Sequence, residues 1–148
     1  MKRTIAIASD HAALDLKAEI KNHLEAQGFS VTDYGTYTKD SCNYPDYAEK
    51  VCNAITEGKQ DLGILVCGTG IGMSMAANKI NGIRAAHVTD SFSARMTKMH
   101  NNANVICLGG RITGLEIASD IVEAYLNAEF QGGRHENRVN KVMALENR

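Results

Sequence analysis

The sequence of 148 residues has 16 lysines and arginines against 17 aspartates and glutamates, so its formal net charge is −1. Hydrophobic residues make up 44% and charged residues 22%, a composition typical of one globular domain, here residues 1–148. The balanced charge argues against a general nucleic-acid binder, and no segment approaches the roughly 20 apolar residues that a membrane helix needs.

The four cysteines form no C-x-x-C pair and have no histidine at zinc-finger spacing, so we expect no structural metal. The first residues contain too short an apolar run for a signal peptide. We therefore expect free thiols and a cytoplasmic protein.

Short apolar segments typical of β-strands alternate with longer segments of helical spacing. The expected strands are residues 4–9, 29–33, 62–67, 83–88 and 104–108. The expected helices fall within residues 14–24, 48–55, 73–80, 91–100 and 115–126, and a last short helix within 132–148. The alternation predicts an α/β fold: a three-layer α/β/α sandwich with a five-stranded parallel sheet, Rossmann-like or flavodoxin-like, plus a C-terminal helix.

Ligands of such sheets bind beyond the carboxyl ends of the strands. The third expected strand ends in a glycine-rich segment, Cys67-Gly68-Thr69-Gly70-Ile71-Gly72. Alternate glycines let the backbone approach an anion, although a tight strand-to-helix turn explains such a segment about as often. Met73 stands where a dinucleotide-binding loop needs glycine and where a cysteine phosphatase loop needs arginine, and the Lys-Ser/Thr of a Walker loop is absent.

Cys67 lies at a strand end beside the start of a helix, a location that favours a thiolate. It could act as a nucleophile or as a general base. The alternative, a buried structural cysteine, is the interpretation that we prefer for Cys52 and Cys107.

Two histidines are candidate acids. His11 follows Asp10 at the end of the first expected strand, and His100 precedes the polar pair Asn101-Asn102. His23 and His87 are interpreted as ordinary surface or hydrogen-bonded residues.

Arg134 and Arg138 are four residues apart, so on a helix they share a face and could bind a phosphate together. Glu136 is available as a partner for either. On spacing alone, a solvated charged face is slightly favoured over a phosphate site.

Taken together, these residues resemble the ribose-5-phosphate isomerase B family, which includes the galactose-6-phosphate isomerase subunits. The resemblance covers nearly the whole chain, with Ala13 standing where many relatives have glycine. Its motifs are Ser9-Asp10-His11-Ala12, Asn43-Tyr44-Pro45-Asp46-Tyr47-Ala48, the glycine-rich segment continuing to Ala76-Ala77-Asn78-Lys79, His100-Asn101-Asn102-Ala103-Asn104, Gly109-Gly110-Arg111, and Gly132-Gly133-Arg134-His135 with Arg138.

The resemblance implies an aldose–ketose isomerase of phosphorylated sugars that works through an enediolate without metal or cofactor. It implies that Cys67 is the base, that Thr69 and the loop amides stabilise the oxyanion, and that His100, helped by Asp10, opens the sugar ring. Some relatives use a glutamate as the base at the position of Met73. A methionine cannot act as a base, so Cys67 is the better candidate here. The remaining implied substrate contacts are His11, Arg111, Arg134 and Arg138 for the phosphate, Tyr44 and Asn101 for the sugar, and Gly68, Gly70, Ile71 and Gly72 of the loop.

The leading hypothesis is the interconversion of ribose 5-phosphate and ribulose 5-phosphate in the pentose phosphate pathway. A hexose 6-phosphate isomerase acting on allose or galactose phosphate is the nearest alternative. A non-catalytic sugar-phosphate sensor and a thiol-dependent phosphatase are the alternatives from other classes.

The expected topology also predicts an oligomer. His100 ends a helix that runs from the carboxyl edge of the sheet to the amino edge, a distance of roughly 15 Å for ten residues. Cys67 lies at the carboxyl edge. We therefore expect a homodimer, possibly a dimer of dimers, in which His100 of one chain serves Cys67 of the other.

Overall fold

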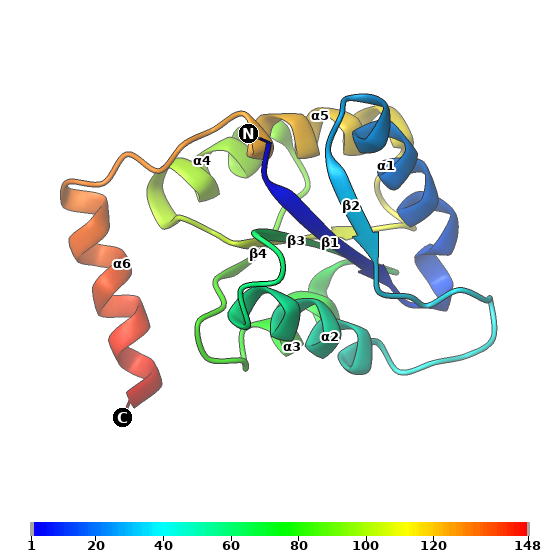
Figure 1. Ribbon diagram of the computed structural model, residues 1–148, viewed down its shortest axis with the longest axis horizontal. Coiled ribbons are helices and arrows are strands. Elements are labelled where there is room, and N and C mark those ends of the chain that lie inside the picture. Colours follow the sequence, from blue (N-terminus) through cyan, green and yellow to red (C-terminus); the bar gives the residue numbers. More distant parts are fainter. Residues whose placement is uncertain (1, 148) are drawn as a thin grey trace.

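The computed structural model describes residues 2–147 and contains a five-stranded parallel sheet between two layers of helices (Figure 1). The strands are β1 (Thr4–Ser9), β2 (Ser30–Asp33), β3 (Leu62–Cys67), β4 (Ala85–His87) and β5 (Val105–Gly109). The helices are α1 (Leu14–Ala26), α2 (Tyr44–Thr56), α3 (Ile71–Ala77), α4 (Ser91–Asn101), α5 (Leu115–Leu126) and α6 (Arg134–Ala144), with short 3-10 turns η1 (His11–Ala13) and η2 (Leu145–Asn147). The three-layer sandwich and the C-terminal helix expected from the sequence are confirmed.

Two apolar cores lie on the two faces of the sheet. One core is formed with α1, α4 and α5, and includes Ile20, Ile121 and the fully buried Tyr125. The other is formed with α2 and α3, and includes Val51 and Met73. Figure 1 shows the same division, with α1, α4 and α5 on one side of the sheet and α2 and α3 on the other.

The strand order is β2-β1-β3-β5-β4. Relative to the flavodoxin order, the last two strands have exchanged places. The reason is burial: all five residues of β5 are buried, whereas the three residues of β4 are partly or fully exposed, which suits an edge position. The expected strand over residues 83–88 is correspondingly short, at Ala85–His87.

The C-terminal helix α6 stands at the end of the molecule opposite the long loop of residues 34–43 (Figure 1). A backbone hydrogen bond from Gln131 N–H to the Met99 carbonyl, 3.0 Å long, joins the segment before α6 to the end of α4. Beyond α6, the Glu146 carboxylate accepts a hydrogen bond of 2.9 Å from Gly82 N–H. These contacts fix both ends of α6 against the body of the protein.

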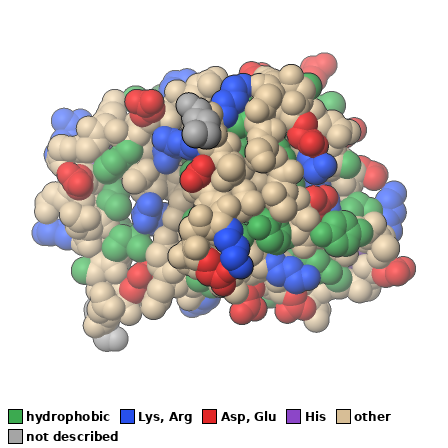
Figure 2. Space-filling model, in the orientation of Figure 1, with side chains coloured by type: hydrophobic (Ala, Val, Ile, Leu, Met, Phe, Trp, Pro, Cys, Tyr) green, Lys and Arg blue, Asp and Glu red, His purple; other side chains and the backbone are tan. Residues whose placement is uncertain are grey.

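Basic and acidic side chains are interspersed over the face drawn in Figure 2, with no large area of one sign. None of the helices within residues 2–147 is long and apolar enough to cross a membrane.

Candidate active site

Three strand ends meet at the carboxyl edge of the sheet. In the β3–β5 register Cys67 pairs with Gly109, and in the β1–β3 register Ser9 pairs with Val66. Backbone hydrogen bonds join the loops that follow: Gly110 N–H donates to the Cys67 carbonyl at 2.7 Å and Arg111 N–H to the Gly68 carbonyl at 3.0 Å. Asp10 N–H donates to the Val66 carbonyl at 3.1 Å, so the segments that follow β1, β3 and β5 lie side by side at this edge.

The Cys67 side chain is 5% exposed and lies under the glycine-rich loop. Gly70 N–H donates to its Sγ at 3.2 Å, a contact that stabilises negative charge on the sulfur. This donation depends on the left-handed conformation of Gly70, at φ +84°. A Cβ at Gly70 would lie 2.8 Å from the backbone of Leu108, so the loop approaches β5 as closely as it does only with glycine there.

The other two buried cysteines have a different environment. Burial raises the pKa of Cys52 to about 12. Burial, followed by the nearby Cys52 and Cys67, raises the pKa of Cys107 well above its usual range. Both thiols stay protonated near neutral pH, in agreement with the structural role predicted for them.

Asp10 and His11 lie beside Cys67 at the end of β1. The Asp10 carboxylate, 8% exposed, accepts a hydrogen bond of 3.0 Å from Ala12 N–H and so caps η1. His11 Nδ1 accepts a hydrogen bond of 3.3 Å from Cys42 N–H, so a neutral His11 carries its proton on Nε2. Cys42 Sγ lies 3.7 Å from the same nitrogen, a contact that the sequence did not reveal because the two residues are 31 positions apart.

Arg111 and Tyr44 complete this edge. A Cβ placed on Gly68 would lie 3.4 Å from Arg111 Nη1, and one placed on Gly72 would lie 2.7 Å from the Tyr44 ring. The two side chains therefore flank the glycine-rich loop. The Thr69 hydroxyl, which is exposed, accepts a hydrogen bond of 3.3 Å from Ile71 N–H at the start of α3.

The remaining candidate residues lie elsewhere. His100 and Asn101 end α4, and Arg134 and Arg138 belong to α6. The strand β5 begins at Val105, which pairs with Gly63 at the amino edge, four residues or roughly 13 Å from the Cys67–Gly109 pair. The structure thus brings together one group of candidates, which we call the carboxyl-edge group: Asp10, His11, Tyr44, Gly68, Thr69, Gly70, Ile71, Gly72, Arg111 and Cys67.

We call the other four candidates, His100, Asn101, Arg134 and Arg138, the amino-edge group. Its residues come together where α4 meets α6. The rings of His100 and His135 stack, with centroids 4.2 Å apart and planes inclined by 7°. His135 appeared in the sequence only as part of a motif, and no spacing rule pointed to this contact.

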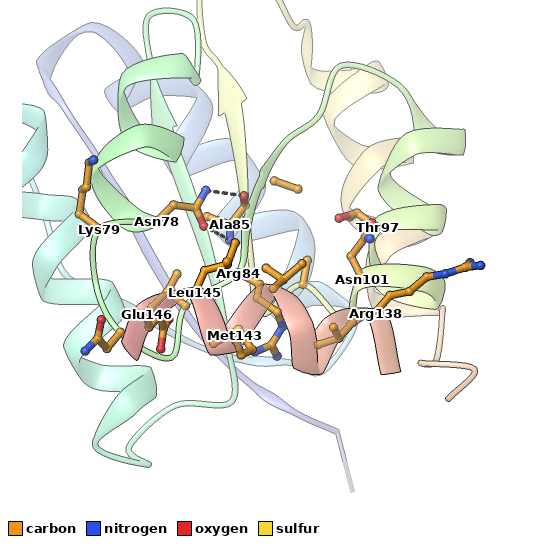
Figure 3. Close-up of a pocket in the computed structure, with 16 residues that line it drawn as sticks. Asn78, Lys79, Arg84, Ala85, Thr97, Asn101, Arg138, Met143, Leu145 and Glu146 are labelled. Carbon is orange, nitrogen blue, oxygen red and sulfur yellow. Dashed lines mark hydrogen bonds between the residues drawn. The ribbon is translucent and has the colours of Figure 1, made fainter. Parts of the chain in front are cut away.

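A cavity of about 700 Å³ separates α6 from the rest of the chain, and Asn101 and Arg138 lie together at one end of it (Figure 3). No residue of the carboxyl-edge group lines this cavity. Among the described residues, Arg111, Arg134 and Arg138 form no ion pair, which leaves three guanidinium groups available to an anion. No group of three or more His, Cys, Asp or Glu side chains within residues 2–147 is arranged to hold a metal ion.

The family described as Ribose/Galactose Isomerase has a sequence model that matches residues 5–142. The chain belongs to the ribose/galactose isomerase family. Ribose-5-phosphate isomerase B of Escherichia coli is 45% identical over 146 residues, which cover 99% of this chain and 98% of the relative. The family thereby identifies this chain as an isomerase of phosphorylated sugars.

Two further members of the family are similar over nearly their full lengths. D-erythrulose-4-phosphate isomerase of Pectobacterium atrosepticum is 49% identical over 140 residues, covering 94% of this chain and 92% of that protein. The crystal structure of ribose-5-phosphate isomerase B from Mycoplasma genitalium, with bound ribulose-5-phosphate, has a TM-score of 0.93 and 42% identity. The match covers 97% of this chain and 96% of that one, so the fold is that of the family.

Proposed function

We propose that this chain interconverts ribose 5-phosphate and ribulose 5-phosphate, as one cytoplasmic step of pentose phosphate metabolism, and that residues 1–148 form a single isomerase domain. The observation that carries the proposal is the Cys67 thiol, which receives the Gly70 N–H at the carboxyl edge of the sheet. The family relatives support the substrate, since one is named for ribose 5-phosphate and another holds ribulose-5-phosphate. The free thiols of all four cysteines suit the cytoplasm.

In the proposed reaction the Cys67 thiolate removes the proton from C2 of the open-chain aldose. The electron pair of the broken C–H bond forms the C1–C2 double bond, and the C1 oxygen becomes the enediolate oxygen. The C2 hydroxyl gives its proton to the C1 oxygen, the thiol returns the first proton to C1, and C2=O forms as the C1–C2 double bond breaks, which gives the ketose. Thr69 and the loop N–H groups lie beside Cys67 and are the available donors for the oxygen as its charge develops.

His11 and Arg111 are the phosphate ligands that the carboxyl-edge group supplies, and Tyr44 beside Gly72 is its sugar contact. Arg134 and Arg138 have no acidic partner among the described residues. They lie with His100 in the amino-edge group, away from the Cys67 of their own chain. A second copy of the chain would supply them, together with Asn101, to the carboxyl edge of its neighbour. We therefore propose a homodimer in which each site draws on both chains.

Ribose 5-phosphate exists mainly as a furanose ring, so the ring must open before C2 can lose its proton. We assign this step to His100 of the second chain, assisted by Asp10. Asp10 suits the assignment because its carboxylate is 8% exposed and lies at the end of β1, next to the Cys67 loop.

D-Erythrose 4-phosphate is the second candidate substrate, because the Pectobacterium relative is named D-erythrulose-4-phosphate isomerase and is 49% identical. The test is to assay the pure protein against four-, five- and six-carbon aldose phosphates. We expect the largest kcat/KM with ribose 5-phosphate. A larger kcat/KM with another aldose phosphate would contradict the proposed substrate while leaving the isomerase chemistry in place.

The base is tested separately with Cys67→Ala. We expect kcat to fall by about 10²–10⁴-fold, the usual contribution of a general base. Cys52→Ala is the matched control, since it removes a buried thiol of α2 and should leave kcat unchanged. Activity of Cys67→Ala within a few-fold of the unmodified protein would exclude Cys67 as the base.

A further inference from the structure

The stacked rings of His100 and His135 occupy the meeting point of α4 and α6. His100 lies in the last turn of α4 and is half-buried, and His135 is the second residue of α6. His135 is 8% exposed and is the one buried side chain of α6. A helix whose other residues are exposed or half-buried thus buries a single imidazole, and the flat face of that imidazole lies against His100.

Backbone contacts bring the two rings together. Gln131 N–H donates to the Met99 carbonyl, next to His100 in the sequence, so the segment before α6 is attached to the end of α4. Gly132 and Gly133 then turn the chain with φ values of +64° and +56°. His135 N–H closes the turn by donating to the Gly132 carbonyl at 3.0 Å. The stack therefore follows from a defined turn.

The charges around His135 favour a neutral ring. Burial lowers the pKa of His135, and the nearby His100, Arg134 and Arg138 lower it further. A neutral ring can remain stacked on His100 when His100 takes up a proton, whereas two imidazolium rings would repel each other. Neither ring nitrogen of His135 has a hydrogen-bond partner within residues 2–147. The orientation of the His135 ring therefore depends on its packing, which includes the stack on His100.

We propose that His135 is a positioning residue, which holds the plane of the His100 imidazole so that its edge nitrogens face the sugar during ring opening. The inference rests on the proposed function, in which His100 opens the furanose. In that step the anomeric hydroxyl gives its proton to the imidazole, and the bond from C1 to the ring oxygen breaks as C1=O forms. A proton then returns to the ring oxygen, so the protein is unchanged overall. A proton shuttle of this kind depends on the orientation of the ring.

Ring opening can be measured without isomerisation in a Cys67→Ala background. The α and β furanose anomers of ribose 5-phosphate interconvert through the open-chain aldehyde, so NMR exchange spectroscopy between the anomeric signals reports ring opening alone. We expect Cys67→Ala to speed this exchange above its spontaneous rate. Adding His135→Ala should lower the catalysed exchange roughly ten-fold or more, because a freely rotating His100 is seldom aligned.

Two further variants separate positioning from other roles. His135→Phe keeps a flat ring against His100 and should retain exchange within about three-fold, and it also guards against poor folding of the alanine variant. Glu136→Ala changes an exposed residue of the same turn and is the matched control. The affinity of each variant for ribulose 5-phosphate, an open-chain ligand, should stay unchanged.

The outcomes distinguish this inference from the proposed function. If Cys67→Ala does not speed anomer exchange, or if adding His100→Asn leaves the exchange as fast, His100 does not open the ring, and its ring-opening role and the positioning role of His135 both fail while the isomerase activity with Cys67 as base still stands. If His100→Asn slows the anomer exchange but His135→Ala exchanges as fast as Glu136→Ala, only the positioning role fails. Weaker binding of ribulose 5-phosphate by His135→Ala, with exchange at saturation unchanged, would make His135 a phosphate ligand and would also overturn the inference.

Discussion

Cys67 differs from the other buried cysteines through its neighbours. Burial in apolar surroundings keeps Cys52 and Cys107 protonated, whereas Cys67 faces a backbone N–H at 3.2 Å. The sequence indicated this difference, because a cysteine between a strand and a glycine-rich helix start lies close to the free backbone N–H groups of that helix. The contacts of His135 and Cys42 could not be predicted, since each depends on a partner at least 31 residues away in the chain.

Arg138 provides a test of phosphate binding. Its guanidinium forms no ion pair with residues 2–147, so Arg138→Ala should break no ion pair within the chain over these residues. We expect KM for ribose 5-phosphate to rise about ten-fold or more while kcat falls less, because a phosphate clamp binds the ground state and the transition state alike. Steady-state kinetics will check this expectation. Unchanged KM would remove Arg138 from the phosphate site, and Lys141→Ala on the same helix is the control for a simple loss of positive charge.

At the scale of elements, the positions of the strands were more predictable than their order. The central strands β1, β3 and β5 are nearly continuous apolar segments, which are typical of a parallel sheet buried on both faces. Their order depends on which strand tolerates exposure, and that is decided by packing across the whole sheet. The sequence could therefore place Cys67 and Arg111 at the same edge, yet it could not predict that β5 lies beside β3.

The glycine-rich loop offers a prediction about one element. Gly70 and Gly58 both have positive φ, at +84° and +75°, but only at Gly70 would a Cβ meet other atoms within 4 Å. Gly58→Ala should lower the free energy of unfolding by about 1 kcal/mol through backbone strain alone. Gly70→Ala should lower it by roughly 1–3 kcal/mol more, because the loop must move away from Leu108. It should also lower kcat, since the N–H donated to Cys67 moves with the loop.

Urea unfolding and kinetics of the two glycine variants give the comparison. Equal losses of stability would show that the loop relaxes without strain. A Gly70→Ala variant with normal kcat would show that the hydrogen bond from Gly70 N–H to Cys67 Sγ is unimportant for catalysis.

The end of α4 carries a buried lysine whose titration should be visible in stability. Lys98 Nζ donates to Asn102 Oδ1 at 2.9 Å, and burial, followed by Arg3 and Arg84, lowers the pKa of Lys98 from 10.5 to about 8. Between pH 8 and 10.5 the unfolded chain therefore holds the additional proton, so the free energy of unfolding contributed by this residue rises with pH.

We expect the stability of the unmodified protein relative to Lys98→Met to increase by roughly 1–3 kcal/mol between pH 7.5 and pH 10. The comparison cancels the titration of other groups, and urea unfolding at both pH values measures it. Lys98→Arg stays protonated across this range and should show no such rise relative to Lys98→Met. A difference that is the same at both pH values would show that Lys98 titrates normally.

At the scale of the whole molecule, the separation of two residue groups is the main result. The carboxyl-edge group holds the proposed base, and the amino-edge group holds His100, Arg134 and Arg138 at the other side of the sheet. From the direction of α4 alone, the sequence predicted that His100 lies at the edge opposite Cys67, and it made no such prediction for Arg134 and Arg138. It could not predict that α6 would stand beside α4 and leave a cavity of about 700 Å³ against the body of the chain.

Subunit mixing tests whether the two groups meet across an interface. Cys67→Ala and His100→Asn, each inactive alone, are mixed under conditions that exchange subunits. In a mixed dimer one site then carries both substitutions and the other carries neither. Random exchange makes half of the dimers mixed with one intact site in each, so about a quarter of normal activity should return.

The matched control for subunit mixing pairs Cys67→Ala with Arg111→Ala, assayed at low substrate concentration. Both residues belong to the carboxyl-edge group of one chain, so every site in that mixture stays damaged and activity should not return. Subunit exchange is verified by mass spectrometry of two differently tagged chains. If exchange is complete and the Cys67→Ala and His100→Asn mixture stays inactive, His100 and Cys67 do not combine across subunits, and the shared site is wrong. If activity also returns in the control mixture, the single variants are partly misfolded and recover on mixing. The two carboxyl-edge residues would then not behave as parts of one site within one chain.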